Sequence, residues 1–402
     1  MSTIAARFQS PFWVRFRDAR SSGVAGVVLG VLACFLTIPP IEARAIVWPI
    51  LVGIVAAVLG LWTQARGLRR LGWGAVAAGL IGIGLGILAT RSSSGNLEQV
   101  FRADLVASML VFATPLVYAA IGGMFSERSG VVNIGLEGMM LMGCFFGVYG
   151  ADKGGSWAIG VLCAAGSGGL LALVHAFFSI HLRADQIVGG TAVNFLALGI
   201  TGYFFVQLYH HQDVGANISS IPDVNLHIRG VPFVGPAFGR LSLMTWGAFA
   251  LVLLSYVVVF KTPIGLRIRA CGEHPRAADT VGINVYAIRY GAVVLSGVLA
   301  GLGGAYLSIG FGAGTFTPNM TEGQGFIALA AMIFGNWRPF GALGAALLFG
   351  FSTALAYRLP VYSGSAATLF QTLPYVLTLI AVAGIIGRTV APAADGKPYK
   401  KQ

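Results

Sequence analysis

The stretch GLRIRACGEHPRAADTVGINVYAIRY, residues 265–290, is a short basic segment between two long apolar runs. The chain around it avoids charge, since 56% of its 402 residues are hydrophobic and only 10% are charged. In soluble domains about a quarter of all residues are charged. The low charged fraction of this chain therefore predicts a membrane protein. The basic stretch is then expected in a loop between two membrane-spanning helices.

Apolar runs that could cross a bilayer recur along nearly the whole chain. A span needs about 20 mostly apolar residues, and we expect about twelve of them. They lie at residues 22–38, 45–63, 71–90, 105–126, 131–150, 156–180, 187–208, 242–260, 290–310, 316–335, 341–357 and 368–387. The fold class predicted is an all-α polytopic transmembrane helix bundle. The weakest spans are 131–150 and 316–335, because each carries a glutamate and several glycines.

The positive charges indicate the direction of the spans, because cytoplasmic loops are enriched in Lys and Arg. With the N-terminus inside, most of the 26 Lys and Arg residues fall on the cytoplasmic side. Those left outside are Arg44, Arg91, Arg102, Lys153, Arg229, Arg240 and Arg358. Both termini and the basic stretch are therefore predicted in the cytoplasm. The net charge of +12 belongs to loops, so no nucleic-acid partner is expected.

Cysteines and histidines give little sign of a metal centre or of disulfides. The four cysteines form no CxxC pair, and a zinc site needs a fuller ligand set than His210, His211 and Asp213 provide. We therefore expect no metal. The first apolar run is longer than the 7–15 residues usual in a signal peptide, which favours an uncleaved first helix.

Two parts of the chain resemble one another. The segment EGMMLMGCFFG (137–147) matches QGFIALAAMIFG (324–335), and each precedes a Gly/Ala/Leu-rich span, at 157–174 and 341–358. An odd number of spans separates the paired segments, so the two halves would run in opposite directions through the bilayer. Inverted repeats with broken helices are typical of transporters.

The basic stretch carries the signals of a short helix. Pro275 suits a first turn, and Gly282 lies where a glycine commonly ends a helix. These signals predict a two-turn amphipathic helix at the cytoplasmic surface. It could bind anionic lipid or form a rigid contact for a cytoplasmic partner.

Five polar residues inside apolar runs are candidates for the transport path: Asn133, Glu137, Asn194, Glu322 and Gln324. Such groups usually face protein or water in a membrane. The amides of Asn133, Asn194 and Gln324 could hydrogen-bond a hydroxylated or heterocyclic solute. All five could instead tie helices together, and for Glu137 we favour this structural role. Glu322 could simply lie at the outer mouth, and His175 is expected to be satisfied internally.

The pattern Gly272-Glu273-x-Pro275-x-Ala277-Ala278, followed by Gly282-Ile283, resembles the coupling-helix loop of ABC importer permeases of the branched-chain amino acid/ribose type. The segments ERSGVVNIGLEGMMLMG (127–143) and HLRADQIVGGTAVNFLALGITGYF (181–204) are similar to the nucleoside branch of that family, which takes guanosine and related purine nucleosides. The resemblance covers about residues 105–390 of the printed sequence.

The resemblance implies the transport subunit of an importer in the bacterial inner membrane, and not an enzyme. It implies a second homologous permease subunit, two ABC ATPase domains and an extracytoplasmic substrate-binding protein, besides the lipid bilayer. The ATPases would dock on Gly272, Glu273, Pro275, Arg276, Ala277, Ala278 and Gly282. No cofactor is expected on this chain and ATP would bind the partner subunits, because the sequence has no G-x-x-x-x-G-K-[ST] phosphate loop.

The resemblance also divides the chain. Residues 1–100 would be an N-terminal extension with three spans, and 101–390 the permease domain with a coupling loop at 261–289. Residues 391–402 would be a cytoplasmic tail. Two other functions stay open: a proton- or sodium-coupled transporter that titrates Glu137 or Glu322, and an ABC permease for simple sugars. A membrane-embedded hydrolase lacks a supporting motif.

Overall fold

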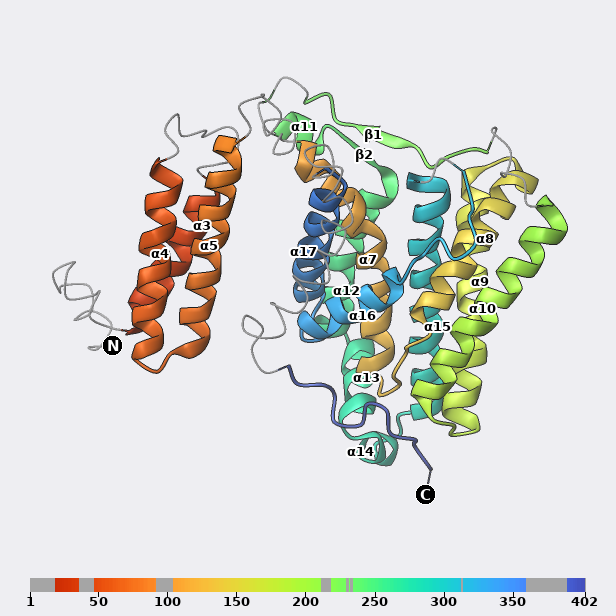
Figure 1. Cartoon of the computed structure of the whole chain (residues 1–402). Coiled ribbons are helices and arrows are strands. Elements are labelled where there is room, and N and C mark those ends of the chain that lie inside the picture. Colours follow the sequence, from red (N-terminus) through yellow and green to blue (C-terminus); the bar gives the residue numbers. More distant parts are fainter. Residues whose placement is uncertain are drawn as a thin grey trace. The chain divides into compact units, whose positions relative to one another are not determined.

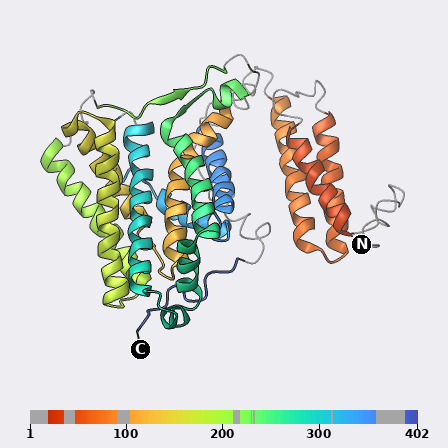
Figure 2. The ribbon, with the colours of Figure 1, turned by 180° about the vertical axis from the view of Figure 1, so that it is seen from behind.

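The computed structural model describes residues 19–35, 47–91, 104–210, 218–228, 231, 234–311, 314–358 and 389–401. The chain forms two compact units. One contains Met1–Leu105 and Leu355–Gly387, and the other contains Val106–Ala354 and Arg388–Gln402. Figures 1 and 2 show the ribbon from opposite sides.

The first unit contains a bundle of three helices, α3 (Ala19–Phe35), α4 (Val47–Ala65) and α5 (Arg69–Arg91). They pack side by side (Figure 1), and the buried hydroxyls of Ser22 and Thr63 lie 3.1 Å apart across the α3–α4 contact. Small residues let helices approach closely in membranes. The glycines at these contacts are Gly26, Gly30, Gly53, Gly60, Gly72 and Gly79.

The second unit is almost entirely helical among the residues described. Its helices are α7 (Asp104–Arg128), α8 (Leu136–Gly154), α9 (Trp157–Ala176), the π-helical turn η1 (Phe177–His181), α10 (Gln186–Tyr209), α11 (Val234–Phe238), α12 (Leu243–Lys261), α13 (Pro263–Glu273), α14 (Pro275–Thr280), α15 (Val285–Ala305), the π-helical turn η2 (Tyr306–Phe311), α16 (Gln324–Phe334) and α17 (Pro339–Arg358). Two short strands, β1 (Asp223–Asn225) and β2 (Arg240–Ser242), pair antiparallel. The all-α class is confirmed.

The two ends of the second unit differ in structure. The strands β1 and β2 and the short helix α11 lie at one end, whereas α13, α14 and the C-terminus lie at the other (Figures 1 and 2). The long helices run between these ends. The coupling segment and the C-terminal tail therefore share one face of this unit.

Glycine contacts bring α8, α9 and α15 together at backbone distance. A Cβ at Gly143 of α8 would overlap the backbone of Gly301, and one at Gly168 of α9 would overlap the carbonyl of Gly297. Both contacts are on α15, which is therefore held against two neighbours. This packing explains much of the glycine content, because lipid tails supply no hydrophobic drive between helices and close contact must do so.

Both halves of this unit show the same order of elements. A long helix ends, the chain runs without regular structure, and a new helix starts inside the protein. In the first half the break is 129–135, between α7 and α8, and in the second it is 314–323, between η2 and α16. Left-handed glycines lie in each break, Gly130 with φ +90° and Gly323 with φ +85°.

The expected spans are borne out in part. Within the ranges that the structure describes, seven helices are long and apolar enough to cross a membrane. The helix expected at 316–335 is wrong as a span, because α16 begins only at Gln324 and its 11 residues rise about 17 Å. The expected span 131–150 begins late, at Leu136. Residues 368–387 lie outside the described residues, and the total of about twelve spans is not confirmed.

A pair of substitutions on α9 tests the glycine packing. We expect Gly168→Val to destabilise the protein by about 1–3 kcal/mol, because the added side chain must push α15 away. Gly166→Val is the matched control, since no atom lies within 4 Å of a Cβ built there. The midpoint of thermal unfolding in detergent measures both variants, and equal losses would contradict the packing account.

Candidate functional site

The two broken helices meet through one carboxylate. Glu137 lies in the first turn of α8, and its side chain reaches the start of α16. Its Oε1 accepts a 2.6 Å hydrogen bond from the Thr321 hydroxyl and a 2.8 Å bond from the Gly323 amide. Its Oε2 accepts a 2.6 Å bond from the Gly325 amide. The carboxylate therefore caps the N-terminus of α16.

This contact is electrostatically favourable and sterically exacting. A helix N-terminus carries unpaired amides and a partial positive charge, so a carboxylate there is stabilising. Gly325 permits the approach, because a Cβ at that position would overlap the backbone and side chain of Glu137. Glu137 is only 8% exposed. The geometry thus gives Glu137 the structural role that the sequence favoured.

Two asparagines hold the start of α8 from the other side. Asn194 of α10 accepts a 2.8 Å bond from the Gly138 amide and donates a 3.0 Å bond to the carbonyl of Ile134. Asn133 is fully buried and donates to the hydroxyl of Ser296 on α15 at 2.9 Å. Both amides tie helices to the first break, and their contact with a solute stays a prediction.

The remaining predicted path residues lie at the start of α16. Glu322 is exposed and has φ +44°, in the left-handed region. Gln324 is half-buried in the first turn of the helix. The five candidates thus gather at two helix starts that Glu137 joins. Of these side chains, Asn133 and Glu137 are buried, whereas Glu322 is exposed and Asn194 and Gln324 are half-buried.

The first break is also clamped by two residues that the path prediction did not include. His175 Nε2 lies 3.0 Å from the carbonyl of Val132, and Gln186 Oε1 accepts a 2.8 Å bond from the Val132 amide. Both side chains are buried. The expectation that His175 is satisfied internally therefore holds at Nε2, whereas its buried Nδ1 has no hydrogen-bond partner among the described residues. Gln186 escaped notice because a single glutamine at the start of a helix carries no periodic signal.

The coupling segment forms two helices, whereas the sequence indicated one. Gly272 and Glu273 end α13, and a second helix, α14, starts at Pro275 as predicted. His274 separates them with φ −138° and ψ 78°. Gly282 has φ +85° and its amide donates to the carbonyl of Asp279, as expected of a terminating glycine.

The surface of α14 is divided between a free face and a buried one. Arg276 and Ala277 are exposed, whereas Ala278 is 3% exposed and packs in a small apolar cluster. Gly272 is buried, and a Cβ there would overlap the carbonyl of Arg128 at the end of α7. Of the predicted docking residues, Arg276 and Ala277 therefore face outward, while Gly272 and Ala278 serve the packing of the segment.

The C-terminal tail contributes to this surface, which the sequence did not predict. The Ala394 amide donates a 2.8 Å bond to the carbonyl of Gly272, and the Ala393 amide donates a 3.2 Å bond to Glu273 Oε2. Glu273 was predicted to dock the ATPase, yet part of its carboxylate is used within the chain. A polar tail after the last apolar run gives no sequence signal for such a contact.

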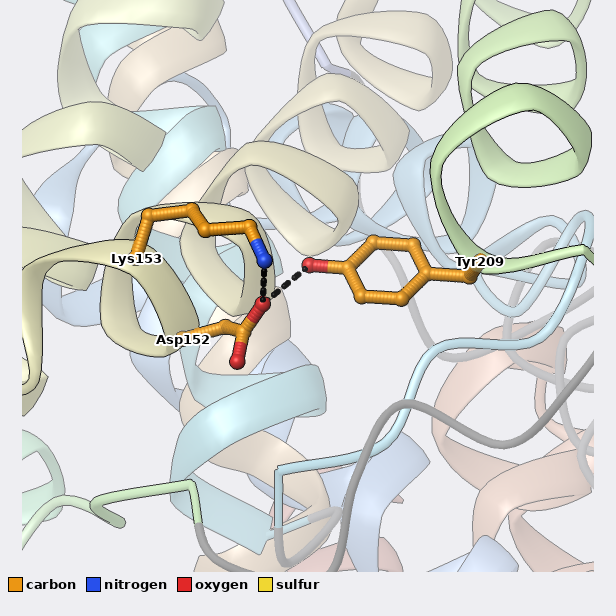
Figure 3. A network of polar contacts seen from close by, with 3 residues as sticks. All are labelled: Asp152, Lys153 and Tyr209. Carbon is orange, nitrogen blue, oxygen red and sulfur yellow. Dashed lines mark hydrogen bonds and ion pairs between the residues drawn. The ribbon is translucent and has the colours of Figure 1, made fainter.

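At the opposite end of the unit, a polar network joins α8 to α10. The Tyr209 hydroxyl donates a 3.0 Å bond to Asp152 Oδ2, and Lys153 Nζ lies 2.9 Å from the same oxygen (Figure 3). Arg240 of β2 pairs with Asp223 of β1 at 2.8 Å.

Among the described residues no cluster of His, Cys, Asp or Glu could hold a metal. The weak metal candidate cannot be placed, because His211 and Asp213 lie outside the described ranges.

A shallow crevice lies among α7, α12 and α17. Its lining is apolar apart from Thr114 and Thr245, whose hydroxyls are bonded to each other at 3.1 Å. None of the five polar path candidates lines it. The crevice therefore offers no free polar group to fix a polar solute.

A matched pair of glutamates tests the role of Glu137. In Glu137→Gln the side-chain NH₂ must face an amide donor of α16, and an unpaired buried group costs about 1–3 kcal/mol. We expect this variant to lower the thermal midpoint in detergent, whereas the exposed Glu322→Gln should stay near the wild type. A Glu137→Gln protein as stable as the wild type would contradict the capping role.

The Asp395 carboxyl makes tail docking sensitive to pH. Burial raises its pKa to about 7, beside Glu127 of α7, Arg289 of α15 and the backbone amide of Gly396. A carboxyl with a raised pKa favours docking while protonated, so its contribution is complete below the ordinary pKa and is lost as the pH rises through about 7.

We therefore expect the amide of Ala394 to lose hydrogen-exchange protection from about pH 6 to about pH 8. Protection factors correct for the intrinsic pH dependence of exchange. The Asp395→Asn variant, which cannot ionise, is the control and should show no such loss. Equal pH dependence in both proteins would exclude Asp395 as the responsible group.

Comparison with known proteins places these features in a family. The family model of the branched-chain amino acid transport system permease component matches residues 105–382. The guanosine ABC transporter permease protein NupQ of Bacillus subtilis (strain 168) is 45% identical over 317 residues, which are 74% of this chain and 96% of the relative.

Two further relatives show how the family varies. The nucleoside ABC transporter permease protein NupC of Lactococcus lactis subsp. cremoris (strain MG1363) is 42% identical over 308 residues, 74% of this chain and 96% of the relative. The putative glucose ABC transporter permease protein TsgC13 of Haloferax volcanii is 37% identical over 262 residues, 64% of this chain and 78% of the relative. No solved structure matches. The broken helices, the coupling segment and these matches show that the chain belongs to the permease components of ABC transport systems of the branched-chain amino acid type.

Proposed function

We propose that this chain is the membrane permease subunit of an ATP-driven importer for nucleosides. The observation that carries the proposal is the similarity to a guanosine permease protein and a nucleoside permease protein, each matched over 96% of its length. The putative glucose ABC transporter permease protein TsgC13 of Haloferax volcanii is less similar, at 37% identity over 78% of its length. This difference favours nucleosides over simple sugars.

The coupling segment supports an ATP-driven mechanism. The helix α14 is short, lies at one end of the second unit and presents Arg276 and Ala277 outward. It is anchored through α13 to the end of α7, where Gly272 meets the carbonyl of Arg128. A push on α14 would therefore reach the first broken helix directly.

The geometry at Glu137 disfavours a transporter driven by protons or sodium. Such a transporter needs a carboxylate on the path that gains and loses its ion. The carboxylate of Glu137 already accepts three hydrogen bonds and is buried. Glu322 is exposed at the second break and caps nothing. Neither side chain has the setting of a buried, exchangeable ion site.

The partners follow from the same proposal. A second homologous permease would complete the path, two ATPase subunits would bind ATP and dock on α13 and α14, and a binding protein would deliver the solute at the end that carries β1 and β2. The protein would lie in the inner membrane. Because the tail and α14 share one end of the unit, an ATPase bound to α14 would have the tail beside it in the cytoplasm.

Uptake of labelled guanosine by cells with and without this gene tests the proposal. We expect uptake to stop on ATP depletion and to persist with an ionophore that spares ATP. Ala277→Arg places a large charge on the free face of α14 and should reduce uptake at least about tenfold, as a central interface residue does. Ala287→Arg, at an equally exposed alanine at the start of α15, is the control for added charge.

Membrane levels of both variants must match the wild type for the comparison to count. Uptake that collapses with the ionophore while ATP remains, together with an unaffected Ala277→Arg variant, would contradict an ATP-driven permease. Uptake of glucose but not of guanosine under the same ATP dependence would keep the permease and replace the solute.

A further inference from the structure

The C-terminal tail, residues 389–401, lies on the coupling segment and is held by its own backbone. Its amides at Ala393 and Ala394 donate to the carboxylate of Glu273 and the carbonyl of Gly272. Both acceptors belong to the last turn of α13. The carbonyls there lack partners within the helix, so the bond from Ala394 gives the carbonyl of Gly272 a partner. The tail therefore caps the C-terminal end of α13.

Farther along, the tail buries an aromatic ring between the coupling helices. Tyr399 is 6% exposed and forms one apolar cluster with Cys271 of α13, Ala278 of α14 and Val285 of α15. Its ring lies 5.6 Å from that of Tyr286. One side chain of the tail thus contacts all three helices of the segment, which fixes α14 against α13 and α15.

Between these two contacts, the tail reaches charged groups buried in the protein. The Asp395 carboxyl lies near the carboxyl of Glu127 at the end of α7, and the two carboxyls interact electrostatically. The guanidinium of Arg289 on α15 donates to the carbonyl of Lys397 at 3.2 Å and to that of Ser129, in the first break, at 3.1 Å. Buried charges need such partners to be tolerated.

The turn 335–338 after α16 is connected to the same group of contacts. The Val390 amide donates a 3.0 Å bond to Asn336 Oδ1, in the turn between α16 and α17. The adjacent Trp337 donates from its ring nitrogen to Glu127 Oε2 at 2.6 Å. The tail therefore contacts the coupling helices, the end of the first broken helix and the end of the second.

We propose that the tail is a strap that ties α13 and α14 to the end of α7 and to the turn 335–338 after α16, and that force from the ATPase reaches this turn in full only while the strap is docked. This inference rests on the proposed function, since it presumes a partner that hydrolyses ATP. The direct contact of α13 with α7 serves the first break and reaches the same turn through Arg128, which donates to the carbonyl of Trp337. The tail adds a second link from the coupling helices to this turn, through Asn336.

Two cysteine reporters test the strap in the complex of this chain with its ATPase. The first is native Cys271, in a chain with Cys34, Cys144 and Cys163 replaced by alanine. It is buried in the apolar cluster that includes Tyr399, so its maleimide labelling reports tail docking. The second is Arg338→Cys in the turn after α16, with Cys271 also replaced by alanine, and it reports movement of that turn.

The maleimide labelling rate of each reporter cysteine is measured in three proteins that differ in the tail. They carry the native tail, the Asp395→Ala/Tyr399→Ala strap variant, or Lys400→Ala/Lys401→Ala as the control. We expect Cys271 to label at least about tenfold faster in the strap variant, as the covered state opens. Trapping the ATPase with ATP and vanadate should change labelling of Arg338→Cys at least about fivefold with the native and control tails. It should change labelling in the strap variant less than about twofold, because the contact of Arg128 with Trp337 is the one link that remains among the described residues.

Three results would overturn the strap: an unchanged Cys271 rate in the strap variant, an equal trapping response in all three tails, or no trapping response with the native tail. Guanosine uptake by the same complexes separates the strap from the solute. If labelling follows the expected pattern but the complexes take up no guanosine, the nucleoside is rejected as the solute and the strap is kept. A chain that assembles with no ATPase would reject both.

Discussion

The carboxylate of Glu137 is the contact on which the centre of the second unit depends. It joins the start of α8 to the start of α16 by three hydrogen bonds. Each helix begins inside the protein, where unpaired amides are costly because no water replaces their partners. One carboxylate satisfies the start of α16, and Asn194 satisfies the start of α8. The two breaks can therefore exist at membrane depth only as a pair.

This constraint shapes how motion can reach the path. Because Glu137 joins the two broken segments at their centre, a conformational change must reach them through the helices on either side. At the end that carries α13 and α14, Gly272 meets the end of α7, and Arg128 donates to the carbonyl of Trp337 in the turn after α16. Both halves thus converge on the coupling segment, as expected of a permease whose energy comes from a separate subunit.

The sequence predicted the features that local rules control. Pro275 and Gly282 delimit α14 because proline and glycine act through the backbone, and the long apolar runs became helices. It missed the tail contacts and the burial of Arg289, because these depend on which segments meet in space. The helix expected at 316–335 failed for a related reason, since its first half runs as turns ending at Gly323, which positions the start of α16 for Glu137. The five polar path candidates lie around two helix starts, but their contact with a solute stays a prediction, and the sequence could not show which of their side chains bond within the protein.

The most direct test of the account is solute accumulation by the purified complex in sealed proteoliposomes, with ATP supplied on the side of α14 and no ion gradient. The account predicts that guanosine accumulates against its gradient only with hydrolysable ATP and in proportion to the ATP consumed. Accumulation driven by an imposed proton or sodium gradient in the absence of ATP would contradict it. In that case the capped carboxylate of Glu137 would have to exchange ions during transport, against the geometry that holds it.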